Sequence, residues 1–167
     1  MGRNSNNDPK KNTERVIYYY DACTLDAEVS INQILNLHHN HGANALTSHL
    51  AIGEAISNVY HKEKKDPIKA VGEYFNLIES LKQQEKLEVC GNDDVEKVFN
   101  DIKTTFPDLS FTDAIHLATA IKNKCQQLHT LDPDLYQLDH KKLKDLAERH
   151  CCYTFNVCDV RTRKKQC

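Results

Sequence analysis

Four acidic residues from separate parts of the chain are candidates to act together: Asp21, Glu54, Asp113 and Asp132. Asp21 and Asp132 each follow a β-rich run, so both are expected at the carboxyl ends of strands. Carboxylates brought close together repel one another and raise one another's pKa unless a divalent cation neutralises them. Oxygen ligands without thiolates suit Mg²⁺ or Mn²⁺. If the four acids converge, they predict a site for such an ion.

Asp113 lies within FTDAIHLATA, residues 111–120, inside the apolar stripe of a predicted helix. One interpretation needs no function, because Ser110 and Asp113 have the spacing of a helix-capping motif. The other places Asp113 in a cleft beside the other acids. Glu54 has the same ambiguity, since it falls about 60° outside the apolar stripe of its helix and is either solvated or lines a cleft. His116, one turn after Asp113, could face that cleft or pack in the core.

The elements that would position these residues alternate along the chain. Strands are predicted over 16–20, 45–48, 87–91, 127–131 and 152–157, and helices over 28–41, 48–61, 67–86, 92–106, 110–124 and 139–149. This alternation predicts an α/β sandwich with a parallel sheet. In such sheets the functional crevice lies outside the carboxyl ends of the strands, where Asp21 and Asp132 are expected.

The composition is that of one globular domain: 167 residues, 40% hydrophobic and 28% charged. We expect a polar leader over 1–15, a folded domain over 16–158 and a basic tail over 159–167. The net charge of −2 gives no overall attraction to nucleic acid or membrane, so a local charge or a metal ion must hold an anionic partner. No stretch approaches the roughly 18 apolar residues of a membrane span, and we expect a cytoplasmic protein.

The seven cysteines, an odd number, are typical of reduced thiols rather than of a disulfide framework. No CxxC spacing marks a zinc site, and Cys23, Cys90 and Cys125 have the apolar neighbours of small core residues. The HHNH run at 38–41 has the form of an ordinary helix end before Gly42, with metal ligation as the alternative.

The RTRKK run near the C-terminus contains no acid. Its cations are candidates to attract RNA phosphates, and the alternative is that they only keep the tail solvated. The residues concerned are Arg161, Arg163, Lys164 and Lys165.

The order YYYDAC, SHLAIGEA, SFTDAIHLATA and LHTLDPDL resembles the four acidic motifs of PIN-domain nucleases, with the four acids at the motif positions. The resemblance implies a PIN-like three-layer sandwich, with a central mostly parallel sheet flanked by helices. It also implies a metal-dependent ribonuclease, most often the toxin of a VapC-type toxin–antitoxin pair. Thr130 looks like the family's hydroxyl contact near the metal or the scissile phosphate. The chain departs from the pattern at Leu131 and Leu135, where family members often carry an Arg and a Phe.

With this resemblance, Asp113 is expected both to cap its helix and to bind metal. The expected activity is Mg²⁺- or Mn²⁺-dependent endoribonuclease cleavage that leaves a 5′-phosphate and a 3′-hydroxyl. The expected partners are RNA, an antitoxin protein and a second copy in a homodimer. Two alternatives stay open: a housekeeping PIN nuclease in RNA processing or DNA repair, and a non-catalytic RNA-binding PIN scaffold.

Overall fold

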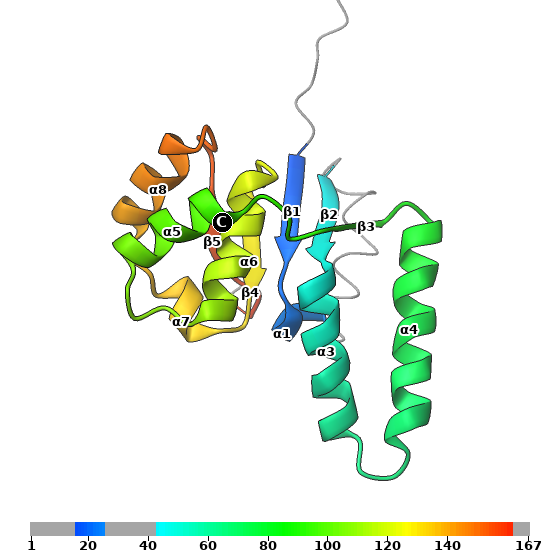
Figure 1. Cartoon of the computed structure of the whole chain (residues 1–167). Helices are drawn as coiled ribbons and strands as arrows, with labels where there is room; N and C mark the ends of the chain where they lie inside the picture. The colour runs from blue at the N-terminus through cyan, green and yellow to red at the C-terminus, as the bar shows by residue number, and fades with distance from the viewer. Residues whose placement is uncertain (1–15, 26–42, 162–167) are drawn as a thin grey trace, which may run out of the picture.

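The computed structural model describes residues 16–25 and 43–161. The described elements follow one another in this order: β1 (Val16–Tyr20), α1 (Ala22–Leu25), β2 (Ala43–Ser48), α3 (His49–Lys62), α4 (Pro67–Gln83), β3 (Leu87–Cys90), α5 (Glu96–Thr105), α6 (Phe111–Lys122), β4 (Gln127–Thr130), α7 (Pro133–Tyr136), α8 (His140–Arg149) and β5 (Asn156–Asp159). Figure 1 shows the strands at the centre and the helices around them.

The strands form one parallel sheet in the order β3-β2-β1-β4-β5. β1 is the central strand, and its VIYYY sequence is the continuous apolar run of a strand buried on both faces. Tyr20 is in register with His129 of β4, and the backbone N–H of Asp21 donates to the carbonyl of His129 at 3.4 Å. The pairing therefore brings the carboxyl ends of β1 and β4 to the same edge of the sheet.

Successive side chains of β1 enter different cores, because the side chains of a strand alternate between its two faces. Tyr19 belongs to a core with Leu128 of β4 and with residues of α5, α6 and α8. Tyr20 belongs to a second core with Ala45 of β2 and with residues of α3 and α4. The molecule is therefore a three-layer α/β sandwich with a parallel sheet, which confirms the fold expected from the sequence.

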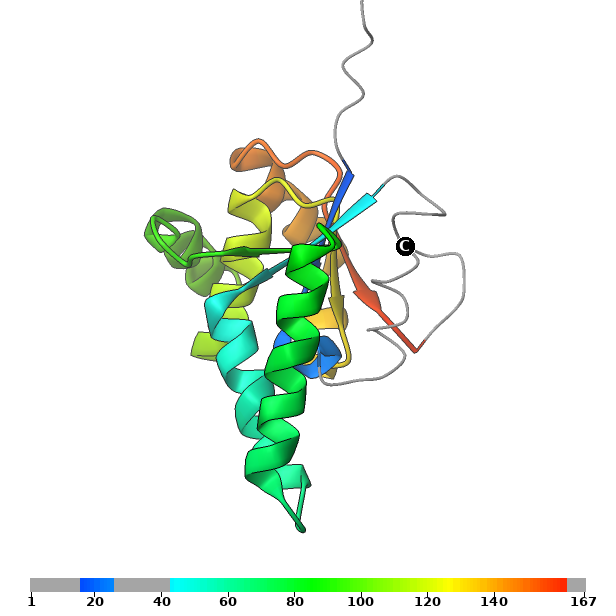
Figure 2. The same cartoon turned by 90° about the vertical axis from the view of Figure 1, so that its right-hand side faces the viewer.

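Helices α3 and α4 form a hairpin that extends beyond the carboxyl edge of the sheet (Figures 1 and 2). Ser48 caps the first helix by accepting a hydrogen bond from the N–H of Ala51, and Asp66 caps the second, whose first residue is Pro67. This geometry carries Glu54, in the middle of α3, past the ends of the strands.

The last strand begins later than its sequence predicts. It starts at Asn156 rather than at residue 152, because the chain first closes the end of α8. Cys151 has a φ of 58°, and the N–H of Cys152 donates to the carbonyl of Ala147, as in a left-handed helix cap. The single-turn helices α1 and α7 were not expected.

Several expectations fall outside the described residues: the leader 1–15, the helix 28–41 with its HHNH run, and the tail from residue 162 onward. Among the described helices, none is long and apolar enough to cross a membrane. Cys125 is a buried free thiol, as expected of a core residue. Five cysteines are free thiols, as expected, but Cys158 of β5 departs from that expectation because it is disulfide-bonded.

Candidate functional site

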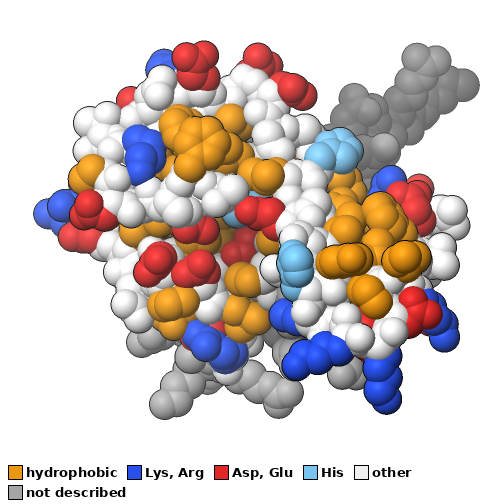
Figure 3. Space-filling model, turned by 60° about the horizontal axis from the view of Figure 1, so that its bottom comes forward, with side chains coloured by type: hydrophobic (Ala, Val, Ile, Leu, Met, Phe, Trp, Pro, Cys, Tyr) orange, Lys and Arg blue, Asp and Glu red, His pale blue; other side chains and the backbone are white. Residues whose placement is uncertain are grey.

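A cleft of about 370 Å³ opens at the carboxyl edge of the sheet, and it contains all four predicted acids. Figure 3, which brings this edge forward, shows acidic side chains gathered in a hollow with hydrophobic patches on either side. The cleft is lined by Asp21, Cys23, Glu54, Ser57, Asn58, Ser110, Thr112, Asp113, His116 and Asp132. Since none of these residues is a lysine or an arginine, the cleft is strongly acidic.

Asp21 forms the floor of the cleft, directly after β1, and is only 3% exposed. Its Oδ1 accepts hydrogen bonds from the N–H of Thr24 and from the thiol of Cys23, each at 3.0 Å. Burial raises the pKa of the Asp21 carboxyl, and the hydrogen bonds that it accepts partly oppose that rise. This buried carboxylate is thus the member of the group that gains most from a nearby cation.

Glu54 projects from α3 and is held by a residue of α6. Its Oε2 lies 2.7 Å from Nε2 of His116, which is 3% exposed. The Nδ1 of His116 lies 3.0 Å from the hydroxyl of Tyr19, which in turn lies 2.9 Å from Oγ of Ser48. A buried hydrogen-bonded chain therefore runs from the cap of α3 through the sheet to the Glu54 carboxylate.

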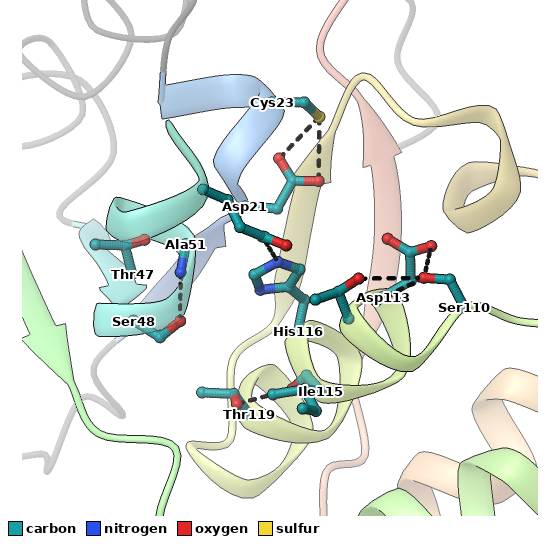
Figure 4. Close-up of polar contacts among 12 residues, drawn as sticks. Asp21, Cys23, Thr47, Ser48, Ala51, Ser110, Asp113, Ile115, His116 and Thr119 are labelled. Atoms are coloured by element: carbon teal, nitrogen blue, oxygen red, sulfur yellow. Dashed lines mark hydrogen bonds and ion pairs between the residues drawn. The ribbon is translucent and has the colours of Figure 1, made fainter. Parts of the chain in front are cut away.

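Asp113 lies in the first turn of α6, and both interpretations of its position describe part of its geometry. Ser110 caps the helix by accepting a hydrogen bond from the N–H of Asp113 at 3.1 Å, and its hydroxyl donates to Oδ2 of Asp113 at 2.5 Å. The carboxylate also lines the cleft, where Figure 4 shows it on the same helix as His116. Burial raises its pKa, and repulsion from Asp132 adds to that rise.

Asp132 follows β4 and caps the short helix α7, where its Oδ1 accepts from the N–H of Asp134 at 2.8 Å. The N–H of Asp132 donates to Oγ1 of Thr130, also at 2.8 Å. Thr130 is fully buried and does not line the cleft. The structure thus places Thr130 beneath the cleft, where it orients the turn that carries Asp132 and where its hydrogen bond to the Asp21 carboxyl lowers the pKa of that group.

The comparisons with known proteins agree with this architecture. Residues 25–141 match the model of the PIN domain family. The chain belongs to the PIN-domain family. The matched segment contains Glu54, Asp113 and Asp132 and begins after Asp21. The fold is also similar to that of PAE2754 from Pyrobaculum aerophilum, with 19% identity and a TM-score of 0.56 over 81% of this chain and 96% of the other. No curated protein matches the sequence.

Membership of this family supports a nuclease-type fold and a hydrolase that acts on nucleic acid and generally uses divalent metal ions. The donors in the cleft have the right chemistry, because four carboxylates supply the hard oxygen ligands that Mg²⁺ and Mn²⁺ prefer. Each carboxylate accepts a hydrogen bond from a different protein group. Within the residues that the structure describes, no three His, Cys, Asp or Glu side chains converge closely enough to hold an ion.

The position of Cys23 in this PIN domain differs from the one predicted from the sequence. The sequence predicts a small core residue, but Cys23 lines the cleft, and its thiol donates to the Asp21 carboxylate (Figure 4). Its sulfur also accepts a hydrogen bond from the N–H of Leu131 at 3.1 Å. Cys23 thus links the turn after β1 to the turn after β4. Its position two residues beyond the strand-ending acid is the signal that could have identified it.

Arg161 is the one predicted RNA-binding cation that the structure describes. Its guanidinium donates to both carboxylate oxygens of Asp159 and to the hydroxyl of Tyr136, and it lies over the Tyr136 ring. Arg161 does not line the acidic cleft. Arg163, Lys164 and Lys165 lie outside the described residues.

Proposed function

We propose that this PIN domain is a metal-dependent endoribonuclease that hydrolyses phosphodiester bonds in RNA. The observation that carries the proposal is the convergence of four carboxylates on one cleft from four separate elements: Asp21 after β1, Glu54 from α3, Asp113 from α6 and Asp132 after β4. A helix cap explains Asp113 alone, whereas a shared metal site explains all four.

The electrostatics of the cleft support a need for metal. A phosphate cannot enter a cleft that has four carboxylates and no lysine or arginine unless a cation intervenes. Asp21, Glu54, Asp113 and Asp132 would hold Mg²⁺ or Mn²⁺ after their side chains move closer together, because no three of them lie within reach of one ion in the structure. When bound, the ion would supply a Lewis acid for the phosphate and lower the pKa of a water molecule.

The protein's own groups have separate tasks in this proposal. His116 holds the Glu54 carboxylate, and Cys23 and Thr24 hold that of Asp21. Ser57 and Asn58, on the α3 wall, present hydroxyl and amide groups that can hydrogen-bond to the ribose and phosphate of a bound strand. A carboxylate oxygen of this group that does not contact the ion would accept a proton from the attacking water.

The chemistry of the cut ends tests this mechanism. The chain is incubated with 5′-labelled single-stranded RNA and Mn²⁺, and the products are mapped and tested for ligation. Attack by water predicts a 5′-phosphate and a 3′-hydroxyl, and it predicts cleavage even where the scissile nucleotide is 2′-deoxy. A 2′,3′-cyclic phosphate, or loss of cleavage at the 2′-deoxy position, would contradict the proposal.

We propose that this chain is a toxin whose antitoxin partner covers the acidic cleft. This proposal rests on the resemblance of the four motifs to those of PIN-domain nucleases, which are most often VapC-type toxins. A brief pulse of expression in a bacterial host should then arrest growth and produce new RNA ends, and Asp113→Asn should do neither. Normal growth together with RNA cleavage in vitro would favour a housekeeping nuclease. Sedimentation of the purified chain tests the predicted homodimer.

A further inference from the structure

A second pocket, of about 430 Å³, lies between the loop that precedes α6 and the short helix α7, which Figure 1 shows next to each other. Its volume is within the range of pockets that bind small molecules, roughly 300–1,000 Å³. The residues of the acidic cleft are polar apart from Cys23, whereas half of those in the second pocket are apolar. These apolar residues are Phe106, Pro107, Leu109, Pro133 and Leu138.

The second pocket and the acidic cleft share a wall. Leu109 lines the second pocket, and the next residue, Ser110, lines the cleft. In the same way Asp132 lines the cleft and Pro133 lines the second pocket, and consecutive Cα atoms are only about 3.8 Å apart. The N–H of Asp134, in the second pocket, donates to the Asp132 carboxylate at 2.8 Å. The second pocket is therefore within reach of a nucleotide next to a phosphate held at the carboxylates.

The chemistry of the second pocket suits a nucleobase better than a phosphate. Asp108 and Asp134 outnumber Lys142, the one lysine or arginine in its lining, so the pocket repels a phosphate. The half-buried ring of Phe106 offers an aromatic surface to a base. Gln137 is exposed, and its neutral amide can both donate and accept hydrogen bonds.

We propose that the second pocket binds the base of the nucleotide next to the scissile phosphate and that Gln137 makes this base adenine. This inference rests on the proposed nuclease function and adds a specificity-determining residue to it. A glutamine amide can form two hydrogen bonds with adenine, at N6 and N7, and such a pair discriminates against other bases by about 10-fold or more. The competing occupant is a cationic side chain of a partner protein, which Asp108 and Asp134 would attract.

The first test measures base preference, which is a ratio within one protein and does not depend on its overall rate. A single-stranded oligoribonucleotide of random sequence is cut in Mn²⁺, and the bases beside the cuts are counted by sequencing. We expect the wild type to prefer adenine about 10-fold at one position beside the cut. Gln137→Glu should prefer cytosine at that position, because a carboxylate only accepts hydrogen bonds and pairs with the cytosine amino group.

The matched control is Gln83→Glu, the same change at an exposed glutamine of α4 outside both pockets, and it should keep the adenine preference. A wild type without an adenine preference beside the cut would overturn the proposal. A Gln137→Glu variant that keeps the wild-type preference would do the same.

A second test needs no cleavage. Adenosine, which has no phosphate, is titrated into the wild-type protein, and arginine amide is titrated in parallel as a cationic probe. In NMR spectra, adenosine should shift the side-chain amide signal of Gln137 and the backbone amide signals of Leu138 and Lys142. Shifts with arginine amide but not with adenosine would overturn the proposal and assign the pocket to a protein partner.

The two tests separate this inference from the proposed function. If the wild type cuts no RNA even with Mn²⁺, the proposed function fails, and adenosine-induced shifts at Gln137 would still show a base-binding pocket. If the wild type cuts RNA but adenosine shifts none of these signals, the nuclease function stands and the base-binding role of the second pocket is refuted.

Discussion

Nε2 of His116 lies 2.7 Å from Oε2 of Glu54, and this contact joins α6 to α3 across the wall of the acidic cleft. His116 is buried and is fixed from behind by the hydroxyl of Tyr19. Glu54 is itself about one-third exposed, so its carboxylate gains its orientation from the histidine rather than from burial. His116 is thus a positioning residue for a candidate metal ligand, a role typical of the groups that surround metal sites in proteins.

His116→Leu should weaken metal binding as well as stability. We expect the Kd for Mn²⁺, measured by calorimetry, to rise about 10- to 100-fold because Glu54 loses its orienting partner. The free energy of unfolding should fall by about 1–3 kcal/mol because the Tyr19 hydroxyl loses a buried partner. A matched control is His150→Leu, which breaks the 2.8 Å contact with Asp101 outside the cleft. Equal Mn²⁺ affinities in both variants would refute the positioning role.

Cys23 should matter through its hydrogen bonds, not as a space-filling core residue. Its sulfur accepts from Leu131 and its thiol donates to Asp21, and a serine can do both. We therefore expect Cys23→Ala to lower kcat about 10-fold at saturating Mn²⁺, whereas Cys23→Ser should retain most of the activity. Cys90→Ala, at a half-buried free thiol elsewhere, is the control. Full activity in Cys23→Ala would show that the thiol has no such role.

His129 should make the protein less stable in mild acid. Its ring stacks on Tyr20, and burial lowers its pKa to about 4, whereas the pKa in the unfolded chain is about 6.5. Between these values only the unfolded chain binds the proton, so the free energy of unfolding falls as the pH falls from 6.5 to 4, by up to about 3 kcal/mol.

Urea unfolding at several pH values measures this dependence. His129→Phe keeps a ring against Tyr18 and Tyr20 and has no proton to bind, so the stability of this variant should change less over the same range. Parallel curves for the two proteins would show that His129 does not titrate as its burial requires.

Replacing Arg163, Lys164 and Lys165 with serine should weaken RNA binding without affecting the fold. The triple variant removes these three cations but keeps Cys167, and it keeps Arg161 with its Asp159 and Tyr136 contacts. Each lost phosphate contact should reduce the slope of log Kd against log salt concentration by about 0.7, with the melting temperature nearly unchanged. Fluorescence anisotropy at several salt concentrations measures the slope. The same slope in both proteins would mean that the tail only keeps the terminus solvated.

The sheet and its edge acids could be predicted from the sequence because their signals are local. VIYYY is a continuous β-rich run, which is stable only where both faces are covered, and Asp21 immediately follows it. Helical periodicity left Glu54 either solvated or in the cleft, and it is the contact with His116 of α6 that places it in the cleft. Parallel strands bring distant residues to one edge, so a few well-placed strands are enough to predict the convergence of the acids.

The remaining features depend on contacts that no short pattern encodes. The position of Cys23 in the cleft could not be predicted, because α1 is a single turn and is too short to show helical periodicity in the sequence. The start of β5 was misplaced because Cys151, not a glycine, adopts the left-handed conformation that closes α8.

Burial and repulsion from Asp132 raise the pKa of the Asp113 carboxyl, so its negative charge is unfavourable in the cleft without a cation. Asp113→Asn keeps the N–H that Ser110 caps and a carbonyl oxygen that the Ser110 hydroxyl can donate to, so the helix cap survives. The variant removes one of the mutually repelling charges. It should therefore be at least as stable as the wild type without metal, although it lacks a metal ligand.

The most direct test is the thermal melting of the wild type and Asp113→Asn in EDTA and in Mn²⁺, with RNA cleavage measured on the same samples. For the wild type, we predict that EDTA abolishes cleavage, and that Mn²⁺ restores cleavage and raises the melting temperature. Asp113→Asn should cut at least about 100-fold more slowly than the wild type, and Mn²⁺ should not raise its melting temperature. In EDTA the variant should melt at the same temperature as the wild type or higher. Undiminished wild-type cleavage in EDTA, or a variant that melts lower in EDTA yet still cuts RNA, would contradict the account.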